Sequence, residues 1–261
     1  MTTPLVGFLG YGRMAQAISE GLDRSGLVPF KRQLAFDVAA GMLEAAKEKR
    51  GILTSPDGLR LAERSPIVVV AVKPHQVRGA LSGIREALKD QLVISIAAGV
   101  TLANLGELVP DGCSLVRVMP NLPALVGKGV TLMTSPPSTD KEDLENARKI
   151  FSAVGEVVDL PESLFNEGMA VSGSGPAYFF LVMEAMIRGA VRLGLTWDTA
   201  RKLVLRTCEG AAATALARPG SHLADLRDQV TSPGGTTAEG LLVLEEGALT
   251  ALFHAALKAV A

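Results

Sequence analysis

The sequence predicts an α/β domain built on a doubly wound, mostly parallel sheet, followed by an all-α domain. Two observations support this order. The first 160 residues alternate short apolar runs of strand length with amphipathic helical patterns, whereas the remaining residues contain long helical patterns with no strands between them. Such alternation is typical of a parallel sheet covered by helices. We therefore predict one domain over residues 1–160 and a second over residues 161–261, with the boundary near Pro161.

Seven apolar segments are predicted to be the strands of the first domain. They are rich in β-branched residues and nearly continuous in apolar character, as expected where both faces of a sheet are covered. The segments are residues 5–10, 33–37, 67–72, 92–98, 115–119, 130–133 and 156–160.

Three long Ala- and Leu-rich helices are predicted in the second domain, at residues 177–194, 198–218 and 238–260. Asp198 is the predicted N-cap of the second of these helices. The apolar surface of these helices exceeds what a small isolated bundle can bury, so we expect it to pack against a second copy of the chain. The alternative is that this surface packs on the first domain.

Composition narrows the class of protein. The chain has 261 residues, of which 48% are hydrophobic and 20% charged, with a net charge of −1, so a nucleic-acid partner is not expected. Two cysteines without a CxxC motif and three scattered histidines argue against a disulfide framework and a metal site. The first residues lack the pattern of a signal peptide, and apolar runs such as PIVVVAV have strand length, too short to span a bilayer. We therefore expect a cytoplasmic protein with no membrane partner.

A glycine-rich loop follows the first predicted strand and opens the first helix. Gly10, Gly12 and Ala15 fill the positions of a G-x-G-x-x-A motif, with Arg13 and Met14 between them. The first glycine permits a tight turn, the second lets a pyrophosphate approach the backbone, and the small third residue allows close helix–strand packing. The helix N-terminus adds free N–H groups for an anion. The motif predicts a dinucleotide site; a purely structural turn is the alternative.

Asp37 stands at the end of the second predicted strand. An acid at this position usually accepts hydrogen bonds from the adenosine ribose and repels a 2′-phosphate. The residues that follow offer no cation, and Arg13 is the one nearby candidate. This pattern favours NADH over NADPH. A helix cap is the alternative role of Asp37, and the two roles can coexist.

Several further motifs stand where ligands bind in such a fold, at the carboxyl ends of strands. They are AVKPHQV (residues 71–77), SIAAGVT (95–101) and RVMPNLPALVGKG (117–129). VSGSGPAYFF (171–180) begins the helical part, and VTSPGGTTAEG (230–240) precedes its last helix.

In this order and spacing, GFLGYGRMA, AVKP, SIAAG, RVMPN, SGSGPAY and VTSPGGTT resemble pyrroline-5-carboxylate reductase over nearly the whole chain. The resemblance implies a Rossmann-like N-terminal domain and a helical C-terminal domain that forms a homodimer, or a multiple of dimers. It also implies reduction of 1-pyrroline-5-carboxylate to L-proline with NAD(P)H, the last step of proline biosynthesis. The cofactor-binding residues it implies are Gly10, Gly12, Arg13, Met14, Ala15, Asp37, Val72, Lys73, Pro74, Ala97, Ala98, Gly99, Asn121 and Pro176.

The composition of VTSPGGTT suits the small carboxylate substrate that this resemblance implies. A carboxylate needs N–H donors, and glycines at a helix start leave such donors free and accessible. Hydride transfer to a protonated C=N needs mainly orientation and one weak proton donor, a role that fits Thr237. The predicted substrate-binding residues are Ser232, Gly234, Gly235, Thr236 and Thr237. The alternative for either threonine is a helix cap.

Four positions depart from the usual pattern of the family and leave cofactor choice and substrate range open: Arg13, His75, Leu122 and Asn166. Rival interpretations are a reductase of another cyclic imino acid, a β-hydroxyacid dehydrogenase, and a non-catalytic NAD(P)-binding regulator. The hydroxyacid enzymes usually need a lysine base in the helical domain, where only Lys202 and Lys258 occur, both outside the motifs above. A regulator has no need for a carboxylate site.

Overall fold

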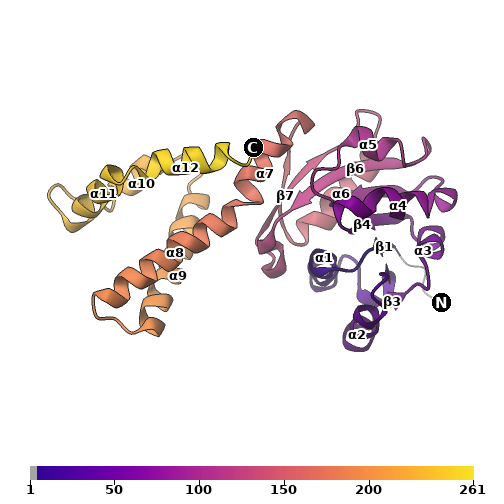
Figure 1. The fold of residues 1–261 in the computed structure, drawn as a ribbon, viewed down its shortest axis with the longest axis horizontal. Helices are drawn as coiled ribbons and strands as arrows, with labels where there is room; N and C mark the ends of the chain where they lie inside the picture. The colour runs from indigo at the N-terminus through magenta and orange to yellow at the C-terminus, as the bar shows by residue number, and fades with distance from the viewer. Residues whose placement is uncertain (1–4) are drawn as a thin grey trace. The chain divides into compact units, whose positions relative to one another are not determined.

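The computed structural model describes residues 5–261, which form two compact units (Figure 1). The first unit ends at Gly173 and carries the sheet; the second, Ser174–Ala261, is helical.

The first unit is built on an eight-stranded sheet of order β3-β2-β1-β4-β5-β6-β7-β8. All seven predicted strands are present, and the sequence pattern missed only the two-residue β3. The strands are β1 (Val6–Leu9), β2 (Gln33–Phe36), β3 (Leu53–Thr54), β4 (Ile67–Val70), β5 (Leu92–Ser95), β6 (Ser114–Pro120), β7 (Gly129–Thr134) and β8 (Gly155–Asp159).

Strand direction confirms a mostly parallel, doubly wound sheet. Only the pairing of β6 with β7 is antiparallel; every other neighbouring pair is parallel. β1 lies between β2 and β4, with Val6 opposite both Gln33 and Ile67. The chain order therefore reverses between β1 and β4, and the carboxyl ends of these two strands form the switch point where ligands bind in such sheets.

Helices cover both faces of the sheet. One core contains Phe8, Ile18 and Phe151, from β1 and the helices α1 and α6. The other contains Leu61, Leu81 and Leu105 from α3, α4 and α5. The α-helices of this unit are α1 (Arg13–Arg24), α2 (Ala40–Arg50), α3 (Gly58–Arg64), α4 (Val77–Ser82), α5 (Leu102–Gly106), α6 (Lys141–Ser152) and α7 (Phe165–Ser172). Five 3₁₀ turns complete it: η1 (Phe30–Arg32), η2 (Pro74–Gln76), η3 (Arg85–Ala87), η4 (Leu122–Val126) and η5 (Glu162–Leu164).

The helical unit contains α8 (Gly175–Arg192), α9 (Trp197–Leu216), α10 (Leu223–Asp228), α11 (Thr236–Glu246) and α12 (Leu249–Lys258). The single helix expected over residues 238–260 is in fact two helices, because the chain breaks at Ala248, whose φ of 57° is left-handed. The predicted N-cap Asp198 is also wrong. Thr196 holds that position, and its hydroxyl accepts a hydrogen bond from the backbone N–H of Thr199 at 3.3 Å.

The predicted domain boundary near Pro161 and the division after Gly173 differ by η5 and α7. These two elements are counted with the sheet because α7 packs on β7. Its residues Phe165 and Ala170 are buried there.

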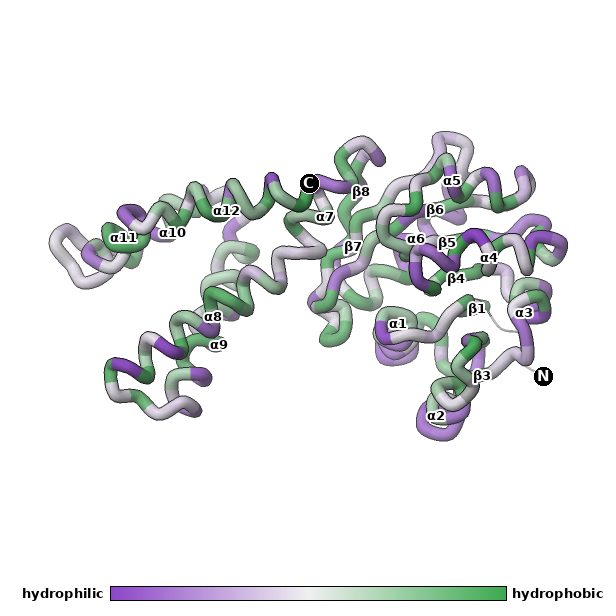
Figure 2. The backbone as a smooth tube through the Cα atoms, in the orientation of Figure 1, coloured by the Kyte–Doolittle hydropathy of each residue, from purple (hydrophilic) through white to green (hydrophobic). Residues whose placement is uncertain are grey.

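Few side chains of the helical unit are buried. Its core cluster consists of Ile187, Ala200 and Val204. Figure 2 shows hydrophobic colour along much of α8 and α12. Large exposed apolar side chains include Phe179, Phe180, Leu181, Leu203, Leu216, Leu242, Val243 and Leu252.

By length and composition alone, Glu162–Arg192 is apolar enough to cross a membrane, because an 18-residue window within it has a mean hydropathy of 1.3. The bent pair α11 and α12 passes the same test. The sequence-based expectation concerned continuous apolar runs, and it is not contradicted here because Glu167, Glu184 and Arg188 interrupt this stretch. That expectation considered strand-like runs, whereas here the apolar residues are spread along successive helices.

Candidate active site

The glycine loop between β1 and α1 has a geometry that only glycine permits at its first position. Gly10 has a φ of 92°, and a Cβ there would lie 2.9 Å from the carbonyl carbon of Ala71. Gly12 is the N-cap of α1, and no heavy atom lies within 4 Å of where its Cβ would be. The first turn of α1 contains no acidic residue. The loop therefore leaves open space beside free N–H groups, which fits a pyrophosphate.

Asp37 holds two loops together at the end of β2. Its Oδ2 accepts a hydrogen bond from the backbone N–H of Tyr11 at 2.7 Å, and its Oδ1 accepts one from that of Ala39 at 2.9 Å. It is not the N-cap of α2, a position that Ala39 occupies. Carboxylate oxygens have further lone pairs, so these bonds leave Asp37 able to accept from a ribose hydroxyl.

A cleft of about 710 Å³ lies at the switch point of the sheet. Five of the predicted cofactor residues line it: Gly10, Gly12, Asp37, Val72 and Lys73. The sequence motifs did not identify the apolar side chains that complete the wall, which include Phe36, Val38, Met42, Leu59 and Ile84. In the sequence these look like ordinary strand, turn or helix positions, and only the fold brings them to the carboxyl edge of the sheet. Phe36 ends β2, Val38 follows it, Met42 is in α2, Leu59 is in α3 and Ile84 follows α4.

The other predicted cofactor residues lie outside the lining of this cleft. Arg13, exposed, and Met14 stand in the first turn of α1, and Ala15 is buried in the core. Pro74 opens η2 after β4. Ala97, Ala98 and Gly99 form the turn after β5, where Gly99 has a φ of 72°. Pro176 belongs to the helical unit, in the first turn of α8.

Asn121 has a clear role in the first unit. Its Nδ2 donates to the carbonyl oxygen of Ser172 at 2.8 Å, and its Oδ1 accepts from the backbone N–H of Val130 at 2.9 Å. The buried amide thus joins the end of β6 to β7 and to the last turn of α7. Each of its polar atoms retains one further hydrogen-bonding capacity.

The segment before α11 presents an accessible helix N-terminus. Gly234 has a φ of 64°, and Gly235 is the N-cap with a φ of −81°. No side chain caps the helix, so neither Thr236 nor Thr237 has the capping role considered above. Both threonines are exposed in the first turn. A Cβ on Gly235 would overlap Oγ of Ser232, so the serine hydroxyl lies directly beside the N-cap.

These features define a class of protein. A glycine loop at the N-terminus of α1, a carboxylate at the end of β2 and a cleft at the switch point are the parts of a nicotinamide-dinucleotide-dependent oxidoreductase. Over residues 5–261, no group of three or more metal-ligating side chains is present.

Comparisons with known proteins identify the particular family. Residues 162–261 match a family profile described as pyrroline-5-carboxylate reductase dimerisation, and residues 5–99 match one described as NADP oxidoreductase, coenzyme F420-dependent. A pyrroline-5-carboxylate reductase of Methanosarcina acetivorans is 40% identical over 254 residues, covering 97% of this chain and 94% of the relative. The chain belongs to the pyrroline-5-carboxylate reductase family.

Solved structures agree with this assignment. A pyrroline-5-carboxylate reductase from Coxiella burnetii superposes with a TM-score of 0.92 at 39% identity, covering 99% of this chain and 96% of that one. A pyrroline carboxylate reductase from Plasmodium falciparum with NADP bound gives a TM-score of 0.88 at 29% identity, covering 100% and 96%.

Proposed function

We infer that this chain reduces 1-pyrroline-5-carboxylate to L-proline by hydride transfer from NAD(P)H to the ring C=N. One observation carries the inference: a single chain of this family combines an open dinucleotide loop at α1 with an uncapped, glycine-led helix start at α11. The first is suited to a pyrophosphate and the second to a small carboxylate.

For the cofactor, we propose the fourteen residues predicted above. Gly10, Gly12, Asp37, Val72 and Lys73 are supported by their place in the cleft. NAD(P)H supplies the hydride, and the protein contributes orientation and exclusion of competing reactions.

For the substrate, we propose that the N–H groups of Gly234, Thr236 and Thr237 and the hydroxyl of Ser232 hold the carboxylate. Gly235, whose N–H donates to the carbonyl oxygen of Ser232 at 2.9 Å, shapes the turn against which the carboxylate lies. The hydride goes to the imine carbon, and the nitrogen takes one proton to give the secondary amine. Thr237 is the proposed donor or orienting group for that nitrogen, because its hydroxyl is exposed and does not cap the helix.

The experiment that tests the function is oxidation of NADH or NADPH, followed at saturating cofactor, with three additions: 1-pyrroline-5-carboxylate, other cyclic imino acids, and none. We expect turnover with the first and identify the product as proline. Faster turnover with another cyclic imine would reassign the substrate, and cofactor binding without turnover on any imine would show a binding protein.

We propose that NADH is preferred over NADPH. Asp37 and Asp57 both line the cleft, and Lys73 is the one lysine or arginine among its lining residues. A 2′-phosphate beside Asp37 would meet like charge.

The test of this preference compares kcat/KM for the two cofactors in Asp37→Asn and Asp37→Ser. Asparagine keeps an oxygen for the Tyr11 or Ala39 hydrogen bond but removes the charge. It should therefore reduce the difference in kcat/KM between NADH and NADPH with less loss of stability than serine. A wild-type preference for NADPH would refute the proposal and direct attention to Arg13.

The assembly we propose is a homodimer formed through the C-terminal helices, or a multiple of such dimers. Its support is the contrast between many exposed apolar side chains and a core cluster of only three buried residues in the helical unit. We further propose a cytoplasmic location, in keeping with two unpaired cysteines.

A further inference from the structure

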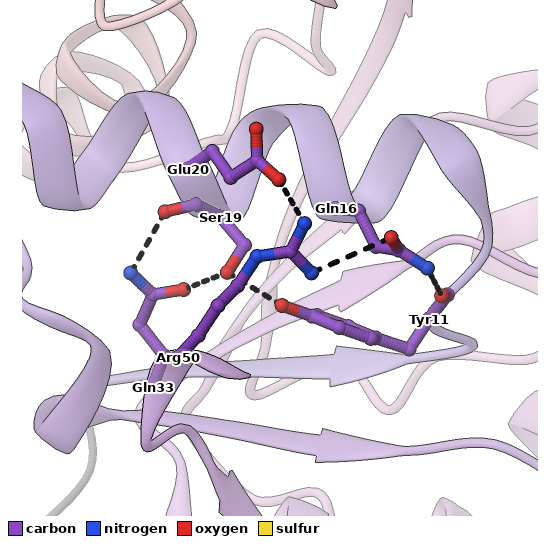
Figure 3. Close-up of polar contacts among 6 residues, drawn as sticks. All are labelled: Tyr11, Gln16, Ser19, Glu20, Gln33 and Arg50. Atoms are coloured by element: carbon purple, nitrogen blue, oxygen red, sulfur yellow. Dashed lines mark hydrogen bonds and ion pairs between the residues drawn. The ribbon is translucent and has the colours of Figure 1, made fainter. Parts of the chain in front are cut away.

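A cluster of polar side chains lies behind the glycine loop and is not used by the proposed chemistry (Figure 3). It joins the loop, α1, β2 and the last residue of α2. Its members are Tyr11, Gln16, Ser19, Glu20, Gln33 and Arg50.

Tyr11, between the two cleft-lining glycines, is fixed through every polar group it has. Its N–H donates to Asp37 at 2.7 Å, and its carbonyl oxygen accepts from Nε2 of Gln16 at 3.0 Å. Its hydroxyl is 2.8 Å from Oγ of Ser19, which donates to Gln33 at 2.5 Å. Burial raises the pKa of the Tyr11 phenol, so it stays neutral in this network. The loop that would hold the pyrophosphate is therefore fixed by hydrogen bonds of the N–H, carbonyl and hydroxyl groups of Tyr11.

Arg50 extends this anchoring to a second element. Its guanidinium pairs with Glu20, and its Nη1 donates to Oε1 of Gln16 at 3.5 Å. Gln16 uses its other amide atom for the carbonyl of Tyr11, so it links Arg50 to the glycine loop (Figure 3). The Arg50 side chain is only 25% exposed, which strengthens these bonds relative to a surface pair.

The two helices joined by Arg50 are each continuous with one wall of the cleft. The glycine loop that leads into α1 forms one of these walls, with Gly10 and Gly12 in the lining. The turn after β2 and the start of α2 form the other, with Asp37, Val38 and Met42 in the lining. Arg50 itself does not line the cleft; it stands at the opposite end of α2 from that wall.

We propose that Arg50 is a positioning residue for the adenosine diphosphate part of the cofactor. By holding α2 to α1 through Glu20 and Gln16, it sets the spacing between the ribose-facing turn and the pyrophosphate-facing loop. Walls that are already in place before the ligand arrives reduce the ordering cost of binding. The proposal rests on the proposed function only for the identity of the dinucleotide.

The test uses Arg50→Met, which keeps the aliphatic stem, and Arg50→Lys, which keeps a cation for Glu20. Arg148→Met is the matched control: Arg148 also pairs with a carboxylate, Asp159 at 2.7 Å, but neither residue belongs to the cleft. Affinity for ADP-ribose is measured by calorimetry without any imine. Kinetic constants are measured with NADH and with reduced nicotinamide mononucleotide, which lacks the adenosine half.

We expect Arg50→Met to weaken ADP-ribose binding and raise KM for NADH by about tenfold, with kcat at saturating NADH and KM for the imino acid nearly unchanged. The kinetic constants of Arg50→Met with reduced nicotinamide mononucleotide should stay close to those of wild type. Arg50→Lys should recover most of the ADP-ribose affinity, and Arg148→Met should match wild type in both measurements. If Arg50→Met is too unstable to purify, Gln16→Met breaks the link to Tyr11 while keeping the Arg50–Glu20 pair, and it should weaken ADP-ribose binding several-fold.

Two results would overturn the proposal. One is a lower melting temperature with unchanged ADP-ribose affinity, which would make Arg50 purely structural. The other is an equal rise in KM for NADH and for reduced nicotinamide mononucleotide, which would mean that the substitution disturbs the whole cofactor site and not the adenosine half alone. Failure of the proposed reductase activity is a separate outcome, because ADP-ribose binding by the wild-type protein does not depend on which imine is reduced.

Discussion

The two units of the chain bury their apolar residues in opposite ways. In the sheet unit, strands such as β4 are almost wholly buried, with Val68, Val69 and Val70 inaccessible to solvent. In the helical unit, α8 exposes Phe179, Phe180 and Leu181 in succession, each more than half accessible. Both units are rich in apolar residues, but only the first provides a complete core within one chain.

This contrast distinguishes apolar residues that are buried within one chain from those that need a second surface to cover them. A helix buries one stripe, and apolar residues all round it indicate burial on more than one side. The sheet unit should therefore keep its stability at any dilution, whereas the helical unit should depend on association.

The largest effect is expected when an exposed apolar residue of the helical unit is made charged. Leu181 is 68% exposed in the single chain, where a surface substitution normally changes stability by about 0.5 kcal/mol or less. If a partner chain covers it, Leu181→Asp buries an unpaired charge, and we expect loss of the dimer together with loss of activity. Light scattering and circular dichroism at several concentrations measure both.

Leu27→Asp is the matched control for that variant, because Leu27 is 42% exposed on the sheet unit, in the loop after α1. It should leave assembly and melting temperature close to wild type. A fully active Leu181→Asp monomer would contradict the proposed difference between the two units, since the helical unit would then need no partner.

The second effect tests the completeness of the sheet core. Gly155 begins β8 opposite Gly129, has a φ of 150°, and has no room for a side chain because a Cβ would overlap the Gly129 carbonyl oxygen. Gly155→Ala should cost about 3 kcal/mol or more in unfolding free energy, measured by denaturant titration, because the backbone conformation and the clash add together. Gly26→Ala is the control: its φ is also positive, at 73°, but its Cβ would meet no neighbour within 4 Å. An equal loss in both variants would show that backbone strain alone sets the cost.

Local pattern was enough to predict much of the fold. Continuous β-branched runs gave seven strands, and the glycine motif placed the loop and the start of α1. The two-residue β3 has too few residues to show a period, so it could not be found that way. The break at Ala248 was missed because alanine is a strong helix former. Gly247, the C-cap of α11, is a local signal for a helix end, but the left-handed residue is the alanine after it.

The candidate site was predictable where backbone conformation forms it, and less so where side chains from separate elements come together only in the fold. Gly10 and Gly12 are identified by spacing alone. Met42 in α2, Leu59 in α3 and Ile84 after α4 line the cleft only because the fold brings these elements to the same end of the sheet, which no short motif encodes. The roles of the two adjacent glycines were also not separable from sequence: Gly234 has the left-handed backbone, while Gly235 is restricted by Ser232.

The third effect concerns chemistry in the helical unit. Thr237 caps nothing in the structure, so Thr237→Val should leave the melting temperature nearly unchanged. If its hydroxyl serves the imine nitrogen, kcat should fall by about 10²-fold with little change in KM for the imino acid. Thr236→Val, one position earlier in the same exposed turn, is the control and should retain most of its turnover. Wild-type kcat in Thr237→Val would leave water or the substrate as the proton source.

The smallest expected effect is a gain in stability when Ala248, at the break between α11 and α12, is replaced by glycine. Glycine in place of alanine inside an exposed helix usually destabilises by about 1 kcal/mol. Ala248, however, has a φ of 57° at the break between α11 and α12, where an L-residue costs roughly 1–2 kcal/mol and glycine does not. Part of that gain is offset because glycine makes the unfolded chain more flexible. We therefore expect Ala248→Gly to raise the stability of the helical unit by about 0.5 kcal/mol.

Ala212→Gly, at an exposed position inside α9, is the opposite member of this pair and should destabilise by about 1 kcal/mol. Thermal unfolding of both variants at one fixed protein concentration compares them, because association would otherwise shift the transition. If Ala248→Gly destabilises as much as Ala212→Gly, the break is not strained and α11 and α12 gain more from a continuous helix than from the turn. In that case the sequence-based prediction of one long helix would describe the preference of the free chain, and the break would have to be imposed by packing in the assembled protein.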